Sequence, residues 1–155
     1  MKGMTLARLA VSVACVAAAG GAYAYDPARV INRAPWPANV SVTYAACHHD
    51  SFTVPASNKD NTGVATAPTK RGACLITSVN ATIAGKNYPV TSYKSSGTSY
   101  SDFVLWYSNG KYVINSKHEL GDTRWVYIVG NTDSPIGDYG YPTGVNPHPE
   151  KDRPH

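Results

Sequence analysis

Residues 103–114 read Phe-Val-Leu-Trp-Tyr-Ser-Asn-Gly-Lys-Tyr-Val-Ile, and this stretch predicts a β-hairpin. Phe103, Leu105 and Tyr107 alternate with the side chains between them, which is the period of two expected of a strand. The dipeptide Asn109-Gly110 then separates two apolar runs. A two-residue hairpin turn needs positive φ at both central residues, and Asn-Gly meets that need best. The hairpin therefore predicts an antiparallel sheet.

Short runs of the same kind occur along most of the chain. Strands are predicted at residues 29–32, 40–44, 52–54, 73–84, 88–93 and 125–129, whereas residues 59–69 and 95–101 are predicted to be loops. The many Tyr, Trp, Val and Thr residues favour strands. No stretch after residue 24 shows convincing helical periodicity. We therefore predict an all-β fold, an antiparallel β-sandwich or a small barrel.

The N-terminal residues have the pattern of a secretory signal. Lys2 and Arg8 precede an apolar run over residues 9–19, and Ala22-Tyr23-Ala24 matches the small-x-small pattern of a cleavage site. A retained membrane anchor and lipidation at Cys15 are the alternatives, but the run is too short to span a bilayer. We expect a cleaved signal helix at residues 1–24, a β-sandwich domain at 25–130 and a Gly/Pro-rich tail at 131–155. The protein is then secreted, either extracellular or periplasmic.

Cys47 and Cys74 are the two cysteines that remain after cleavage. In an oxidising compartment, an even pair in a small domain indicates one disulfide. The alternative is a reactive or metal-binding thiol pair, but the spacing fits neither a CxxC motif nor a zinc site. A bridge that closes this loop stabilises the fold by about 3–4 kcal/mol in the chain-entropy model.

The charge of the chain argues against nucleic-acid binding. The sequence has 14 Lys+Arg and 10 Asp+Glu, and removing Lys2 and Arg8 leaves 12 against 10. Nucleic-acid binding proteins concentrate Lys and Arg on one face or stripe, and this sequence shows no such cluster. We therefore expect no nucleic-acid partner.

Three stretches carry a resemblance to a known family. They are residues 41–54, which include Cys47, residues 71–78, which include Cys74, and the Ser/Gly-rich residues 95–103. Together they resemble a family of small secreted domains named from nematode genes induced when insulin-like signalling is lost. The resemblance covers roughly residues 29–114. It implies an exported β domain with a paired cysteine and supplies no catalytic residues.

The sequence offers little catalytic chemistry. No serine lies in a Gly-x-Ser-x-Gly elbow, and His118 is expected to be a surface residue past a strand end. His48, His49 and Asp50 form the one compact cluster of metal-ligand types, but adjacent side chains on a strand point to opposite faces. We therefore predict a protein that is not an enzyme, with no metal and no cofactor.

The predicted loop at residues 95–101 is the preferred recognition element. Ser and Gly give adaptable hydrogen bonding, and Tyr gives broad contact at low entropy cost. Trp36, Trp106 and Trp125 are further aromatic candidates for a surface belt, although core packing is the alternative for each. The candidate ligand-binding residues are Tyr93, Ser95, Ser96, Gly97, Thr98, Ser99, Tyr100, Trp36 and Trp125.

These features predict a non-enzymatic binding domain for a cell-surface, glycan, lipid or protein ligand. Two other functions are kept as alternatives. One is a membrane-active or pore-forming toxin, because small basic aromatic β proteins can insert at interfaces. The other is an inhibitor or immunity-type protein that blocks one partner with a loop.

Overall fold

The structure is a computed structural model that describes residues 24–58 and 61–129. Its elements in order are β1 (Arg29–Asn32), β2 (Ala38–Tyr44), β3 (Asp50–Val54), β4 (Gly63–Thr66), β5 (Ile76–Ile83), β6 (Val90–Thr91), β7 (Tyr93–Thr98), β8 (Asp102–Ser108), β9 (Lys111–Ser116) and α1 (Lys117–Val129). The predicted signal peptide, apart from Ala24, and the predicted C-terminal tail lie outside the described residues.

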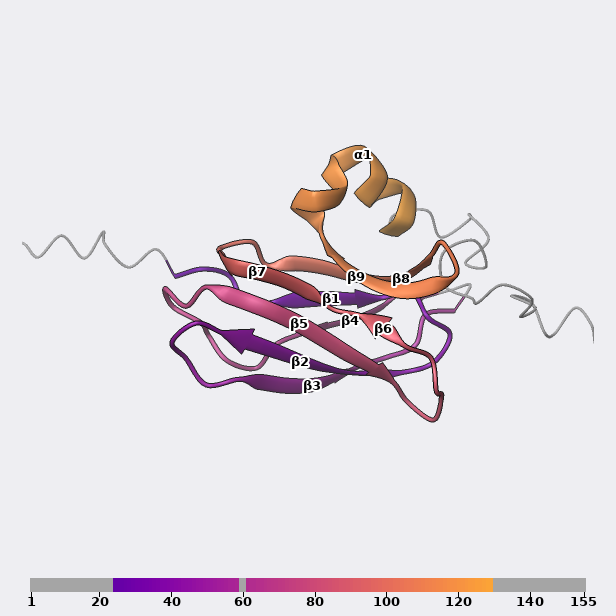
Figure 1. The fold of residues 1–155 in the computed structure, drawn as a ribbon, viewed down its shortest axis with the longest axis horizontal. Helices are drawn as coiled ribbons and strands as arrows, with labels where there is room; N and C mark the ends of the chain where they lie inside the picture. Colours follow the sequence, from indigo (N-terminus) through magenta and orange to yellow (C-terminus); the bar gives the residue numbers. More distant parts are fainter. Residues whose placement is uncertain (1–23, 59–60, 130–155) are drawn as a thin grey trace, which may run out of the picture.

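The strands form two sheets packed face to face, with α1 on the outside of one of them (Figure 1). The five-stranded sheet has the order β4-β1-β8-β9-β6, and the four-stranded sheet has the order β3-β2-β5-β7. Side chains from both sheets form one core, including Val30 and Phe103 from the first sheet and Val42 and Val79 from the second. The mostly β fold with two sheets is thus confirmed.

The sheets are not entirely antiparallel. β1 pairs with β8 in parallel, and β6 pairs with β9 in parallel. The chain also changes sheet within one predicted strand: Val90 and Thr91 belong to the five-stranded sheet, while Tyr93 begins β7 in the other. The purely antiparallel arrangement predicted from the sequence is therefore wrong for these two pairs.

The hairpin that decides the fold has the predicted turn. β8 and β9 pair antiparallel from Phe103↔Ser116 to Ser108↔Lys111. Asn109 and Gly110 have φ of 51° and 83°, the positive values that the two-residue turn requires. The turn prediction is confirmed.

The last predicted strand, residues 125–129, is wrong because these residues belong to helix α1. The helix starts with a capping box: Ser116 Oγ accepts the Glu119 amide at 3.1 Å, and Glu119 Oε2 accepts the Ser116 amide at 2.8 Å. Gly121 interrupts the helix with φ of 76°. This break interrupts the repeat of three to four residues by which a helix is predicted from sequence.

Helix α1 covers the outer face of the five-stranded sheet. Leu120, Trp125 and Ile128 pack against Val104 and Trp106 of β8 in a second cluster of buried side chains, which also contains Ile31. β8 is consequently buried on both faces, with Phe103 and Leu105 in the main core. The cover explains why both alternating sets of β8 side chains are apolar.

Two smaller expectations are also corrected. The predicted loop at residues 59–69 contains β4, which pairs antiparallel with β1. In β5, Ile76 and Val79 would lie on opposite faces of a regularly alternating strand, but both are buried because the register shifts between Ile76 and Ser78. A bulge of this kind moves the following side chains to the other face.

We predict that Trp125→Ala lowers the free energy of unfolding by about 3–5 kcal/mol, because it removes a buried aromatic side chain and leaves a cavity. Val126→Ala on the same helix is the control, since Val126 is 62% exposed and should change stability little. Denaturant unfolding of both variants measures the difference. Equal stabilities for the two variants would contradict the packing of α1 on β8.

Candidate functional site

A hollow of about 350 Å³ lies between the start of β8 and the first half of α1. We call it the Tyr100 pocket. Its lining residues are Tyr100, Asp102, Lys117, His118, Gly121 and Asp122. The helix break at Gly121 therefore lies in the wall of the pocket, and aromatic, acidic and basic groups share a small space.

Tyr100 and His118 form an aromatic pair in this pocket. Their rings are stacked, with centroids 4.2 Å apart and planes inclined by 14°. Tyr100 Oη also lies 3.3 Å from His118 Nε2. Tyr100 is 43% exposed, which is unusual for a large aromatic side chain in this domain. The pair thus presents an aromatic surface that a ligand can contact.

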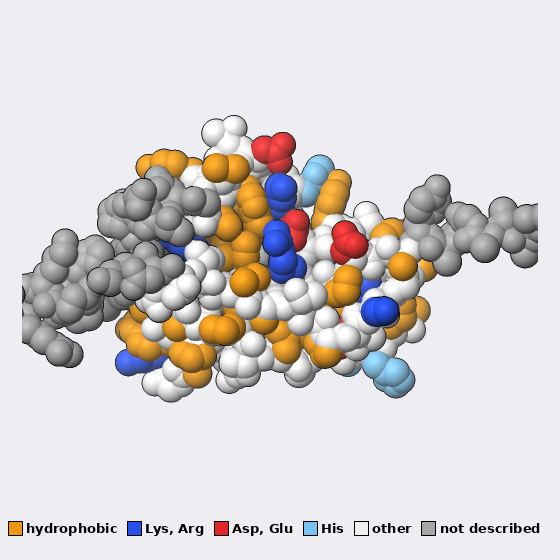
Figure 2. Space-filling model, turned by 180° about the vertical axis from the view of Figure 1, so that it is seen from behind, with side chains coloured by type: hydrophobic (Ala, Val, Ile, Leu, Met, Phe, Trp, Pro, Cys, Tyr) orange, Lys and Arg blue, Asp and Glu red, His pale blue; other side chains and the backbone are white. Residues whose placement is uncertain are grey.

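Charged groups surround the aromatic pair. Asp102 accepts a hydrogen bond from Arg29 Nε at 2.9 Å, in an ion pair that joins β1 to β8. Lys117 and Asp122 add one charge of each sign. On the face opposite to that of Figure 1, basic and acidic side chains and a histidine lie close together in the upper part of the view (Figure 2). The pocket offers both donors and acceptors and has little net charge.

The loop that carries Tyr100 is held from inside the protein by Arg71. Arg71 is 2% exposed, and its guanidinium donates to the carbonyls of Ser99 at 2.6 Å and Tyr100 at 3.0 Å. Ser101 Oγ donates to the Asp26 carbonyl at 2.9 Å, which ties the same loop to the N-terminal segment. Backbone held by a buried charged donor has little freedom to move.

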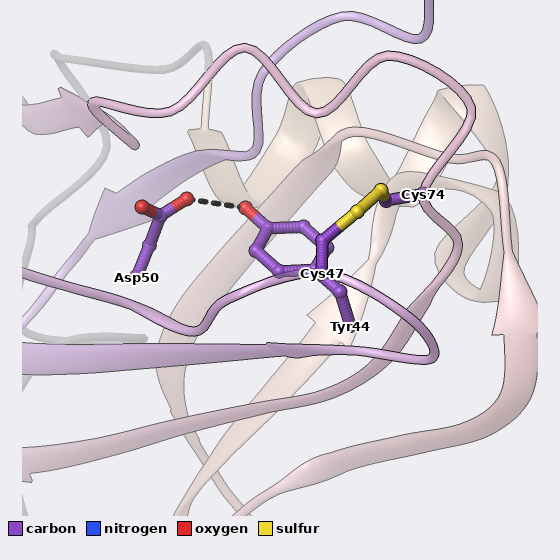
Figure 3. The surroundings of a disulfide bond; sticks show 4 residues. All are labelled: Tyr44, Cys47, Asp50 and Cys74. Atoms are coloured by element: carbon purple, nitrogen blue, oxygen red, sulfur yellow. Dashed lines mark hydrogen bonds between the residues drawn. A yellow bond between two sulfur atoms is a disulfide. The ribbon is translucent and has the colours of Figure 1, made fainter.

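A buried polar cluster continues from Arg71 toward the disulfide. Tyr44 Oη donates to Asp50 at 2.5 Å, and Thr69 Oγ1 donates to the other oxygen of the same carboxylate at 2.5 Å. The Tyr44 ring lies beside the bridge between Cys47 and Cys74 (Figure 3). The predicted disulfide is confirmed, and it closes one end of the domain next to this cluster.

The environment shifts the pKa of two members of the cluster. Burial, followed by the hydrogen bond to Asp50 and its charge, raises the pKa of Tyr44 above its ordinary value of 10. Burial lowers the pKa of Arg71, while Tyr44, Tyr25 and Asp26 oppose that effect. The Tyr25 ring also contacts the Arg71 guanidinium, 5.1 Å from the ring centroid. Tyr44 therefore stays protonated as a donor to Asp50.

Arg33 is a second buried arginine with a different environment. It is 1% exposed, and none of its three guanidinium nitrogens has a hydrogen-bond partner in the part of the chain that the structure describes. Burial alone lowers its pKa. A buried guanidinium without acceptors costs free energy, whereas Arg71 has its cost offset by carbonyl oxygens.

The structure separates the residues that the sequence grouped as one recognition loop. The predicted loop at residues 95–101 is wrong over its first half, since Ser95–Thr98 belong to β7. Tyr93 and Thr98 are buried, and Ser95 Oγ donates to the Ile76 carbonyl at 2.8 Å.

The remaining candidates of this stretch differ from one another in their surroundings. Ser96 is exposed on β7, and Gly97 packs over Leu75. The Ser99 carbonyl accepts a hydrogen bond from Arg71. Tyr100 is the predicted ligand-binding residue that lies in the pocket.

None of the three tryptophans lines this pocket. Trp106 of β8 and Trp125 of α1 are buried in the cluster between the helix and the sheet, and each is 6% exposed. Trp36 stacks on Tyr88 with ring centroids 5.4 Å apart, and Lys86 lies over its ring. The Arg124 guanidinium lies over the Trp106 ring, 6.0 Å from its centroid. A continuous belt of exposed tryptophans is not formed.

The pocket contains residues that sequence reasoning missed. Asp102, Lys117 and Asp122 were not proposed as ligand-binding, and His118 was expected to be an ordinary surface histidine. The pattern Ser-x-x-Glu at residues 116–119 is the sequence feature from which the position of helix α1 could have been predicted. It predicts a helix start just after β9, and hence a helix close to the end of the β8–β9 hairpin.

The described residues contain no group of three or more His, Cys, Asp and Glu side chains placed to hold a metal ion. His48 and His49 are exposed, while Asp50 is buried and engaged by Tyr44 and Thr69. No helix among residues 24–58 and 61–129 is long and apolar enough to cross a membrane.

Comparison with known proteins gave no match to a family model, a curated protein or a solved structure.

We predict that the two buried arginines respond oppositely to methionine. Arg71→Met removes the donors to Ser99 and Tyr100 and should lower the free energy of unfolding by about 1–3 kcal/mol. Arg33→Met removes a buried charge without acceptors and should raise it by about 1 kcal/mol or more. Urea unfolding measures both. Destabilisation by Arg33→Met as large as that by Arg71→Met would show that Arg33 has a stabilising partner.

Proposed function

We propose that this protein is an exported, non-enzymatic binding domain that recognises a sugar residue of a surface glycan in the Tyr100 pocket. The observation that carries the proposal is the exposed Tyr100 ring, stacked on His118 and bordered by Asp102 and Asp122. Sugars combine apolar C–H faces with a ring of hydroxyl groups. A site for them needs an apolar surface next to a few polar groups of fixed position.

Each part of the pocket matches one part of such a ligand. The Tyr100 ring packs against the C–H face, and its hydroxyl is available at the edge. Carboxylate oxygens of Asp102 and Asp122 accept hydrogen bonds from sugar hydroxyls, and such charge-assisted bonds are short and strong. Lys117 supplies donors to sugar oxygens. Because donors and acceptors occur together, the pocket suits a neutral polyol better than a purely apolar ligand.

The rigidity of the pocket supports binding without large rearrangement. Arg71 holds the Ser99 and Tyr100 carbonyls, and Arg29 holds the Asp102 carboxylate. Binding to a site that is ordered beforehand loses less conformational entropy. A hydrolase of glycans, by contrast, needs a carboxylic acid in an apolar environment as proton donor. Asp102 faces a guanidinium instead, which favours binding over catalysis.

Export is supported by the disulfide and by the N-terminal sequence. Disulfides persist in oxidising compartments, and Cys47 and Cys74 form one here. The signal peptide predicted at residues 1–24 would direct this export. Membership of the small secreted family resembled by residues 29–114 remains part of this proposal and fits the same compartment.

We predict that an array of oligosaccharides and cell-wall fragments identifies a ligand for the mature domain, residues 25–155. Tyr100→Ala should weaken binding of that ligand at least tenfold, which corresponds to about 1.4 kcal/mol. Tyr100→Phe keeps the ring and should lose much less. Tyr127→Ala is the matched control, because Tyr127 is an exposed tyrosine of α1 that does not line the pocket.

The outcomes separate the three candidate functions. Isothermal titration of the array hit with the four proteins tests the site directly. An array hit whose affinity is equal in the wild type and in Tyr100→Ala would refute the Tyr100 pocket as its site. Leakage of dye-filled liposomes without any glycan hit would favour the membrane-active alternative, and tight capture of one secreted protein would favour the inhibitor.

A further inference from the structure

A second hollow, of about 470 Å³, lies between β7, β9 and α1. It shares no lining residue with the Tyr100 pocket. Three basic side chains from three different elements line it: Lys94 from β7, Lys111 from β9 and Arg124 from α1. We call this hollow the basic groove. Residues distant in sequence thus bring three positive charges to one concave surface.

The basic groove keeps a net positive charge, because its three cations share the lining with a single carboxylate. Among the described residues, none of these three cations forms an ion pair; the ion pair found there joins Arg29 to Asp102. Glu119 is the carboxylate that lines the groove. Its Oε2 is already used, because it accepts from the Ser116 amide at 2.8 Å and from Asn115 Nδ2 at 3.3 Å as part of the helix cap.

The apolar part of the groove is firmly positioned. Trp106, Val113 and Leu120 line it. Trp106 and Leu120 belong to the buried cluster under α1, and the partly buried Val113 packs against that cluster. Trp106 Nε1 donates to Asn115 Oδ1 at 2.9 Å, and the Arg124 guanidinium lies 6.0 Å from the Trp106 ring centroid. Lys111 follows directly after the Asn109-Gly110 turn, whose conformation is fixed by two positive φ values. The groove therefore combines a rigid apolar wall with three cations.

We propose that the basic groove binds a phosphate or sulfate ester whose anionic group meets Lys94, Lys111 and Arg124 and whose apolar stem packs on Trp106, Val113 and Leu120. Guanidinium and ammonium groups form charge-assisted hydrogen bonds with such oxyanions, and Arg matches their geometry particularly well. Concave sites with apolar walls and a few polar groups are typical of small-molecule binding. This site is independent of the glycan function proposed for the Tyr100 pocket.

Hexyl phosphate is the probe that tests both halves of the groove. We expect it to bind with an affinity that falls as NaCl is added, because salt screens exposed charges. Inorganic phosphate should bind more weakly, and hexanol should not bind measurably. The readout is the NMR signal of the Trp106 indole N–H, which reports from inside the groove.

Substitutions locate the site. Lys111→Gln with Arg124→Gln should weaken hexyl phosphate binding at least tenfold, since each charge-assisted hydrogen bond contributes more than a neutral one. Lys86→Gln is the control, because Lys86 lies over Trp36 and does not line the groove. Tyr100→Ala should leave this binding unchanged, so failure of the glycan site does not affect the result. Unaltered binding in the double variant, or none in the wild type, would overturn the proposal.

A second experiment, vesicle sedimentation, distinguishes a lipid headgroup from a soluble ester as the ligand. Vesicles of phosphatidylcholine with and without phosphatidic acid are sedimented with the wild type and with the double variant. Sedimentation that needs phosphatidic acid and is lost in the double variant supports a lipid headgroup as the ligand. Hexyl phosphate binding without vesicle binding supports a soluble ester.

Discussion

The buried guanidinium of Arg71 is the interaction on which the candidate site depends. It donates to three consecutive carbonyls, of Thr98, Ser99 and Tyr100, and contacts the ring of Tyr25. The Cys74 amide donates to the Arg71 carbonyl at 2.8 Å, which links this residue to the disulfide. Through its side chain and its backbone carbonyl, Arg71 thus connects the N-terminal segment, the bridged end of the domain and the loop before β8. Such a group is expensive to bury, and the carbonyl oxygens offset that cost only in this conformation.

Helix α1 provides the second constraint, because both candidate sites use it as a wall. Lys117, His118 and Asp122 line the Tyr100 pocket, whereas Glu119 and Arg124 line the basic groove. The helix is held in place by Leu120, Trp125 and Ile128 on β8. Packing of a few apolar side chains on one sheet therefore determines the position of polar groups on two surfaces.

Much of the fold was predictable from local sequence, and the candidate site was not. The Asn109-Gly110 turn and the alternation in β2 follow from rules that act within a strand or a turn. The pairing of Cys47 with Cys74 follows instead from the cysteine count, since these two remain after the predicted cleavage. The hydrophobic pattern does not predict helix α1, because Gly121 breaks its period, although Ser116 and Glu119 mark its start. The Ser- and Gly-rich sequence of β7 predicts a loop, because these residues do not favour strands. In the structure the Ser95 hydroxyl hydrogen-bonds to β5 across an irregular register. The pocket joins residues 100–102 to residues 117–122, and no local pattern predicts that contact.

The claim that Arg71 holds the Tyr100 loop in one conformation is tested most directly by ¹⁵N relaxation of the backbone amides of residues 99–101 in the protein without ligand. The account predicts order parameters of about 0.85, as in rigid backbone, and lower values in Arg71→Met. Order parameters below about 0.6 in the wild type would contradict it. The recognition loop would then be mobile before binding, and Arg71 would not preorganise the site.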